Sequence, residues 1–440
     1  MDLKGKFVSG FLLACGFGNT VSASDFDTPL NIILIMADDF GYECLGINGS
    51  EYHTPHIDRL AEQGIRFTNC FSNPLSTPSR VQLMTGKYNV KNYIAFGKLD
   101  RKEVTLGNVF SNAGYATCIA GKWQLGKEKD SPAHFGFQQS CLWQHTAGAV
   151  DSKGADTRYA SPIVDVNGEL KEYPIDTFGP DVYSDFIIDF IRAHRSQPFF
   201  VYYPMCLTHC PFVSTPDSEN WEASRSSTYK GDTIYYSDMV AYTDKMVGKI
   251  IDELQEQGLM DNTLIIFTGD NGTDTSIMTM LNGEPYRGGK GKTIDSGVHV
   301  PLVVYHPKGI KGVDNQQLID FTDFLPTVCE AADIPINQLN DLDGISFYSS
   351  VIGKNAKERD WIYCWYAPRK VYDEAAQVFV RDETYKLYRD GRFYNVKQDF
   401  YELHPISVEK MDEQQCKAYH KLHEVMKHYE VYALKRRLNK

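Results

Sequence analysis

Nearly continuous apolar runs recur along most of the chain, separated by segments with apolar residues every three or four positions. The runs are rich in Ile, Val, Leu, Phe and Tyr, as strands covered on both faces are. We predict strands at Asn31–Ala37, Tyr115–Ala120, Pro198–Pro204, Thr263–Thr268 and Val300–Tyr305, and helices at Asp181–His194 and Tyr235–Gln257. Such alternation predicts an α/β fold with a large, mostly parallel sheet flanked by helices.

The pattern changes near Asp343-Gly344. Shorter strands are predicted around Gln377–Arg381, Tyr385–Tyr388 and Arg392–Asn395, followed by a charged amphipathic helix at Val408–Arg437. This order predicts a smaller C-terminal antiparallel sheet closed by a helix. We therefore divide the chain into a catalytic domain at residues 24–345 and a C-terminal α+β subdomain at 346–440.

Residues 1–23 are typical of an export signal. Lys4 and Lys6 precede the short apolar run Phe7–Gly18, and a cleavage-like site ends at Ala23. The run is too short to span a membrane, and we predict no transmembrane segment elsewhere. The tetrapeptide ending at Cys15 resembles a bacterial lipoprotein box, so lipidation at Cys15 is the alternative to cleavage near Ala23. Either way, we expect a periplasmic or secreted protein.

The charge of the chain bears on its partners. The formal net charge is -12, which argues against a nucleic-acid partner because polyanions bind basic surfaces. An acidic enzyme that acts on an anionic ester would need a local group of cationic side chains.

Polar residues follow four of the predicted strands. They are Asp38 and Asp39 after the first, Lys122 after the second, His209 after the third, and Asp270 and Asn271 after the fourth. The carboxyl ends of parallel strands meet at one edge of a sheet, where ligands bind. Three carboxylates and an amide oxygen there suit Ca²⁺ or Mg²⁺. Arg80, Lys122, His209 and Lys290 suit a tetrahedral oxyanion.

The segment Ser76–Arg80 indicates the start of a helix. Thr77 is a candidate N-cap and Pro78 suits the first helical position, so we predict a helix over Ser79–Met84 towards Gly86. Ser76 would then lie just ahead of a helix N-terminus, where backbone N–H groups favour negative charge. An ordinary capped helix without chemistry is the alternative.

These residues resemble the type I sulfatase family of the alkaline phosphatase superfamily. The signature is Ser76-Thr77-Pro78-Ser79-Arg80-Val81-Gln82-Leu83-Met84-Thr85-Gly86, and the likeness continues through Ala37–Gly41, Thr54–Ala61, Gly121–Gly126, Gly269–Gly272 and Gly289–Gly291. The resemblance covers most of residues 30 to 345. It implies an alkaline phosphatase-like fold and a Ser-type bacterial carbohydrate sulfatase.

The resemblance also implies a mechanism. In this family the residue at Ser76 is oxidised to formylglycine by a sulfatase-maturing enzyme. One oxygen of its hydrate attacks sulfur, and the other expels sulfate. By the same resemblance, Asp38, Asp39, Asp270 and Asn271 bind Ca²⁺, with the modified Ser76 completing the shell. Arg80 and Lys122 would hold the formylglycine. His209 and Lys290 would bind sulfate, and one of them would protonate the leaving oxygen.

One position departs from the family pattern. The family has His where this chain has Gln124, which cannot act as a base. The base that breaks down the sulfated intermediate is therefore left open, although Gln124 can still position the hydrate by hydrogen bonding.

We expect the substrate to be a sulfated carbohydrate of host or dietary glycans, with galactose or N-acetylgalactosamine sulfate favoured. Two other functions stay open: a phosphate or phosphonate ester hydrolase of the same superfamily, and a non-catalytic sulfoglycan-binding protein. Five residues could shape a sugar pocket or simply pack a loop: Trp143, Gln144, His145, Tyr159 and Asn167.

Overall fold

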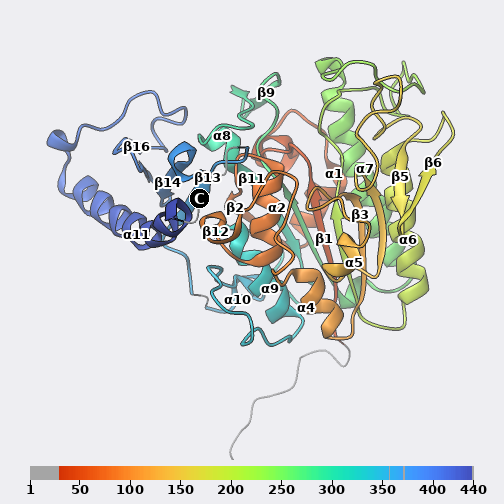
Figure 1. Ribbon diagram of the computed structural model, residues 1–440, viewed down its shortest axis with the longest axis horizontal. Helices are drawn as coiled ribbons and strands as arrows, with labels where there is room; N and C mark the ends of the chain where they lie inside the picture. Colours follow the sequence, from red (N-terminus) through yellow and green to blue (C-terminus); the bar gives the residue numbers. More distant parts are fainter. Residues whose placement is uncertain (1–28, 356, 370–371, 439–440) are drawn as a thin grey trace, which may run out of the picture.

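A mixed, ten-stranded sheet forms the larger part of the molecule (Figure 1). This computed structural model describes residues 29–355, 357–369 and 372–438, so the predicted export signal and Cys15 lie outside the described residues. The strands, in their order across the sheet, are β12 (Val313–Asp320), β2 (Ile65–Phe71), β11 (His299–Tyr305), β8 (Thr263–Gly269), β1 (Asn31–Ala37), β7 (Phe199–Pro204), β3 (Ala116–Lys122), β4 (Gln139–Trp143), β5 (Ile163–Val166) and β6 (Glu169–Glu172).

The pairing within this sheet is mostly parallel in its centre. Strands β8, β1, β7, β3 and β4 run parallel, as do β2 and β12. Strand β11 is antiparallel to both of its neighbours, and β5 and β6 form an antiparallel edge. The predicted fold class is confirmed. The five predicted strands are present with ends shifted by at most two residues.

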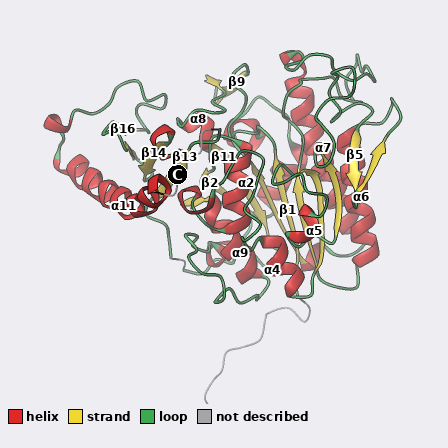
Figure 2. Ribbon diagram, viewed as in Figure 1, coloured by secondary structure: helices red, strands yellow, loops and turns green. Residues whose placement is uncertain are grey.

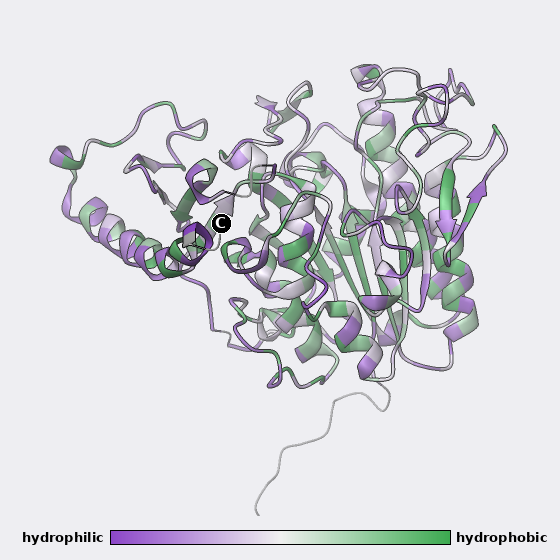
Figure 3. Ribbon diagram, viewed as in Figure 1, coloured by the Kyte–Doolittle hydropathy of each residue, from purple (hydrophilic) through white to green (hydrophobic). Residues whose placement is uncertain are grey.

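Helices cover both faces of the sheet, as Figure 2 shows. Along β1, Ile32, Leu34 and Met36 belong to one buried cluster, whereas Ile33 and Ile35 belong to the other. The first face packs against α2 (Ser76–Thr85), α4 (Leu106–Asn112) and α9 (Phe324–Ala331), and the second against α1 (Pro55–Glu62), α6 (Gly179–His194) and α7 (Tyr236–Glu256). Because both faces are buried, the central strands are mostly apolar (Figure 3).

The C-terminal part forms a four-stranded antiparallel sheet. Its strands are β13 (Ile362–Tyr366), β14 (Gln377–Arg381), β15 (Tyr385–Tyr388) and β16 (Phe393–Asn395), and α11 (Glu413–Leu438) packs on them. The predicted helix start at Val408 was wrong, since Val408–Lys410 is an isolated 3-10 turn and α11 begins at Glu413. The domain boundary between residues 345 and 346 stays a prediction.

The shorter elements connect these layers. They are α3 (Asn89–Asn92), α5 (Ser131–His134), α8 (Asp295–Val298), α10 (Tyr348–Val351) and the hairpin of β9 (Met278–Leu281) and β10 (Glu284–Arg287). Within the described part of the chain, no helix has both the length and the apolar character needed to cross a membrane.

Candidate active site

Strands β1 and β8 bring three carboxylates together. Their parallel register pairs Ala37 with Gly269, so the residues that follow both strands emerge side by side. Asp39 N donates to Asp270 Oδ1 at 3.0 Å, and Asn271 Nδ2 donates to Asp39 Oδ1 at 2.9 Å. Asp38, Asp39, Asp270 and Asn271 are all fully buried. A hard cation would relieve the repulsion between such carboxylates, and their oxygens are the ligands it prefers.

Ser76 lies beside these carboxylates. Its Oγ is 3.1 Å from Asp38 Oδ1, 3.4 Å from Asn271 Oδ1 and 3.3 Å from Lys122 Nζ. The predicted N-cap at Thr77 was wrong: α2 begins at Ser76, and Leu75 is its N-cap residue. Pro78 is tolerated in the first turn because N–H groups there have no intrahelical partner. Ser76 is therefore the first residue of the helix.

Buried cations balance the carboxylates. Lys122 Nζ is 2.6 Å from Asp38 Oδ2, and Arg80 Nη2 is 3.0 Å from Asp270 Oδ2. Arg80 Nη1 also donates to the Lys122 carbonyl at 2.8 Å. Lys290 pairs with Asp39. Each of the three carboxylates thus pairs with one cationic side chain that the sequence analysis had singled out. These side chains could also bind an anionic substrate group beside a metal ion.

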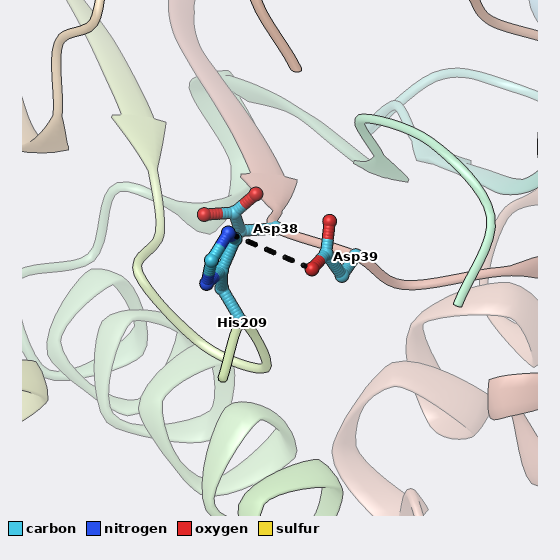
Figure 4. Close-up of side chains that lie close together, drawn as sticks. All are labelled: Asp38, Asp39 and His209. Atoms are coloured by element: carbon cyan, nitrogen blue, oxygen red, sulfur yellow. Dashed lines mark ion pairs between the residues drawn. The ribbon is translucent and has the colours of Figure 1, made fainter. Parts of the chain in front are cut away.

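His209 reaches the cluster from the loop after β7. Its Nε2 is 3.8 Å from Asp39 Oδ2, the contact marked in Figure 4. Among the described residues, Asp38, Asp39 and His209 form a group that could hold a metal ion, since their ligand atoms lie within 4.8 Å of one another. Figure 4 shows the imidazole between the two carboxylates and the loop that carries it.

Burial and neighbouring charges perturb the pKa values at the site. Burial raises the pKa of Asp270 to about 7, with Asp38 adding to the rise. Burial also favours a higher pKa for Asp38, but the charges of Lys122 and the other cationic side chains around it together outweigh burial, and the pKa falls well below its usual range. Burial, together with the charge of Lys290, lowers the pKa of His209 well below its usual value. Without a cation, full ionisation of all three carboxylates is therefore unfavourable, and Asp270 in particular tends to keep its proton.

Gln124 follows β3 with an unusual backbone. Its φ is 54°, in the left-handed region, and Asp39 has a similar φ of 58°. Strain of this kind is often found at functional sites. The Oε1 of Gln124 is buried and has no hydrogen-bond partner among the described residues. A buried acceptor without a donor is costly, so this oxygen is placed to accept from a group that binds there.

Arg158 is a site residue that sequence reasoning missed. Its Nη1 is 2.6 Å from His209 Nδ1, its guanidinium stacks on Trp143 at 4.1 Å, and Asp156 pairs with it at 3.2 Å. The contact with Arg158 orients His209. No local pattern distinguishes Arg158, although the Trp143 on which it stacks was among the candidate pocket residues.

The candidate sugar-pocket residues mostly pack loops. Trp143, His145 and Tyr159 are buried. Trp143 Nε1 donates to Thr157 at 3.1 Å, His145 Nε2 contacts the Glu128 carbonyl at 2.9 Å, and Tyr159 Oη donates to the carbonyls of Cys206 and His209. Tyr159 therefore supports the loop that carries His209.

Comparisons with known proteins agree with this geometry. The family model described as "Sulfatase" matches residues 30–334, and one described as "N-sulphoglucosamine sulphohydrolase, C-terminal" matches residues 290–438. Arylsulfatase A of Homo sapiens is 31% identical over 392 residues, covering 82% of this chain and 75% of that protein. An N-acetylgalactosamine-6-O-sulfatase of Bacteroides thetaiotaomicron is 27% identical over 408 residues, covering 76% and 78%. The crystal structure of the PsFucS1 sulfatase from Pseudoalteromonas sp. superposes with a TM-score of 0.73 at 24% identity, covering 93% of this chain and 91% of that one.

Proposed function

This chain belongs to the sulfatase family and is therefore a sulfuric ester hydrolase, and we propose that it desulfates sugars by means of a formylglycine made from Ser76. The observation that carries this proposal is the environment of Ser76. Its hydroxyl is buried between a carboxylate, an amide oxygen and the Lys122 ammonium at the start of α2. An oxygen nucleophile held there has a cationic partner to stabilise its charge.

The donor set fits a calcium ion. Asp38, Asp39, Asp270 and Asn271 would hold it through oxygen atoms, with the modified Ser76 as a further ligand. Burial and the nearby Asp38 raise the pKa of Asp270, and a bound cation would stabilise its ionised form. When bound, the ion would polarise the sulfate and lower the pKa of the hydrated formylglycine, which supplies the nucleophile.

The four anion-binding residues divide into an inner and an outer pair. The Arg80 and Lys122 side chains are 0% and 3% exposed, whereas those of His209 and Lys290 are 12% and 15% exposed. The inner pair would hold the nucleophile at Ser76. The outer pair lies towards solvent, where a sulfate ester enters, and each can donate an N–H to a sulfate oxygen or to the leaving oxygen.

Gln124 would also hold the hydrated formylglycine at position 76. Its unpaired Oε1 is an acceptor, so a hydroxyl of the hydrated formylglycine would satisfy it. An amide cannot remove the proton, and the role of Gln124 is therefore positioning.

The substrate is proposed from the relatives. A bacterial relative is named an N-acetylgalactosamine-6-O-sulfatase, and we favour a galactose or N-acetylgalactosamine sulfate for this chain. Ser76 would require a maturase that oxidises serine. We also propose export to the periplasm or outside the cell by residues 1–23, with lipidation of Cys15 as the alternative.

Co-expression with a serine-type maturase tests the proposal. The matured enzyme should release sulfate from a panel of sulfated monosaccharides. The Ser76 peptide should lose two hydrogens in mass spectrometry, and protein made without the maturase should be inactive. A phosphonate monoester serves as the comparison substrate. Full sulfatase activity with an unmodified Ser76, or a preference for the phosphonate ester, would contradict the proposal.

A further inference from the structure

A second hollow opens at the same edge of the sheet, between the start of α7 and the β9 hairpin. It encloses about 540 Å³, within the range of small-molecule sites of roughly 300–1,000 Å³. Its lining residues are Glu51, Tyr52, Thr233, Ile234, Tyr236, Ser237, Ser276, Ile277 and Met278. We call it the α7–β9 pocket. None of its lining residues belongs to the active site described above.

The pocket adjoins the active site through two contacts. On its floor, Tyr236 Oη donates to the Asp39 carbonyl at 3.2 Å. On its wall, the segment that carries Ser276 and Ile277 runs beside the segment that ends at Lys290. Gly288 N donates to the Ile277 carbonyl at 3.1 Å. These two contacts place the pocket next to the segments that carry Asp39 and Lys290.

The rim between the two sites is charged but balanced. Lys230 Nζ is 2.5 Å from Asp274 Oδ2, and Ser276 Oγ donates to Asp274 Oδ1 at 2.7 Å. The Lys230 side chain is 50% exposed. Because Asp274 pairs with Lys230, the charge of this lysine is balanced beside the pocket.

The chemistry of the lining favours a sugar ring. Four lining residues, Tyr52, Thr233, Ser237 and Ser276, carry hydroxyl groups, in addition to the buried Tyr236 whose hydroxyl already bonds to Asp39. Ile234 and Met278 are 66% and 55% exposed and offer apolar surface for the C–H face of a ring. Mixed apolar and hydroxyl surface is typical of sites that bind neutral polar ligands.

The charge of the pocket lining favours neutral sugars over anionic ones. Among the lining residues that the structure describes, the one charged side chain is Glu51. Its Oε1 accepts from Thr279 Oγ1 at 2.8 Å and from Met280 N at 3.0 Å, which holds the carboxylate at the pocket. A carboxylate accepts hydrogen bonds from sugar hydroxyls but repels a uronate or a second sulfate.

We propose that the α7–β9 pocket binds an uncharged sugar residue next to the sulfated one, so that the enzyme acts on oligosaccharides. This rests on the proposed function, in which the sulfated residue lies at Ser76. The pocket thus selects substrates by the neighbour of the sulfated sugar.

Kinetics with three substrates test the proposal: a sulfated monosaccharide, the same sugar joined to a neutral hexose, and the same sugar joined to a uronic acid. For the matured enzyme we expect kcat/KM to be at least about tenfold higher for the neutral disaccharide than for the other two substrates. Ser237→Trp should fill the pocket and remove this advantage while leaving monosaccharide turnover unchanged. Gln255→Trp, at an exposed position near the far end of α7, is the matched control and should behave as wild type.

Equal kcat/KM for monosaccharide and neutral disaccharide in the wild type would overturn the proposal. An equal loss of kcat/KM on the monosaccharide and on the neutral disaccharide in Ser237→Trp would overturn it as well. A separate binding measurement does not depend on turnover: the unsulfated neutral disaccharide should bind the wild type and Gln255→Trp in calorimetry, but not Ser237→Trp. If sulfate release fails on every sugar yet this binding pattern holds, the proposed function fails and the pocket assignment stands. Absence of binding to the wild type refutes the pocket.

Discussion

Replacing Asp270 with asparagine separates metal binding from folding. The substitution keeps the shape of the side chain and an oxygen that can accept from Asp39 N, but it removes one buried negative charge. In the metal-free enzyme, burial and the charge of Asp38 raise the pKa of Asp270 from 3.8 to about 7. At about 1.4 kcal/mol per pKa unit, ionising this carboxyl costs the folded state about 4 kcal/mol.

The sign of the pH effect follows from the raised pKa. The folded protein holds this proton more tightly than the unfolded chain does, so Asp270 makes the metal-free enzyme lose stability as the pH rises from about 4 to about 7. Asp270→Asn escapes that loss, and the attraction of Arg80 Nη2 for the carboxylate is already included in the raised pKa. At pH 8 and without metal, we therefore expect the variant to be up to about 4 kcal/mol more stable than wild type. With calcium the order should reverse, because only the wild type keeps all three carboxylates.

Urea unfolding at pH 5 and pH 8, with chelator or with calcium, measures both effects, and calorimetry gives the calcium affinity. Asp295→Asn is the control of opposite sign. Asp295 is buried, which favours a higher pKa, but the charges of Arg381, at 2.7 Å, and Lys386 together outweigh burial and lower the pKa. That variant should lose stability at pH 8 whether or not calcium is present. A metal-free Asp270→Asn protein that is less stable than wild type at pH 8, or that binds calcium with unchanged affinity, would refute the reasoning.

Three further predictions concern turnover by the matured enzyme. In rapid mixing, the wild type should show no burst of alcohol, and Gln124→His should lower kcat, because the site is built around the amide. A burst in the wild type that the histidine variant relieves would contradict this. Arg158→Lys should lower kcat about tenfold or more with little change in KM, since lysine cannot both stack on Trp143 and reach His209; an equal rise in KM would indicate a binding role instead. Lys290→Gln should reduce kcat/KM by about 10²–10³-fold while the urea midpoint changes little, and a loss below tenfold would remove Lys290 from the reaction.

Part of the active site follows from local pattern alone. Strands β1, β3, β7 and β8 are buried on both faces, and their apolar runs identify them and mark where each one ends. Because parallel strands place their carboxyl ends together, the sequence predicts that Asp38, Lys122, His209 and Asp270 approach one another. In the structure, Lys122 pairs with Asp38, and both His209 and Asp270 contact the neighbouring Asp39.

Other elements were harder to predict because their burial depends on distant partners. Strand β2 mixes buried and half-buried positions and contains the polar residues Arg66, Thr68 and Asn69, and so lacks the continuous apolar run. The start of α2 was predicted two to three residues late, since the capping rule favoured Thr77 as the cap. In the structure, the Thr77 Oγ1 instead accepts from Gly97 N at 3.1 Å, a contact that local sequence does not encode.

By itself, the sequence determined the strand ends to within two residues, the motif around Ser76 and the supply of oxygen ligands and cations. Only the tertiary structure decided that Arg158 contacts His209, that Gln124 carries an unpaired oxygen, and that a pocket opens between α7 and β9. The physical reason is the range of the interactions. Periodic burial and helix capping act within a few residues, whereas a loop contact such as Arg158 with His209 joins positions 51 residues apart. Such a contact exists only after the sheet has brought the loops together.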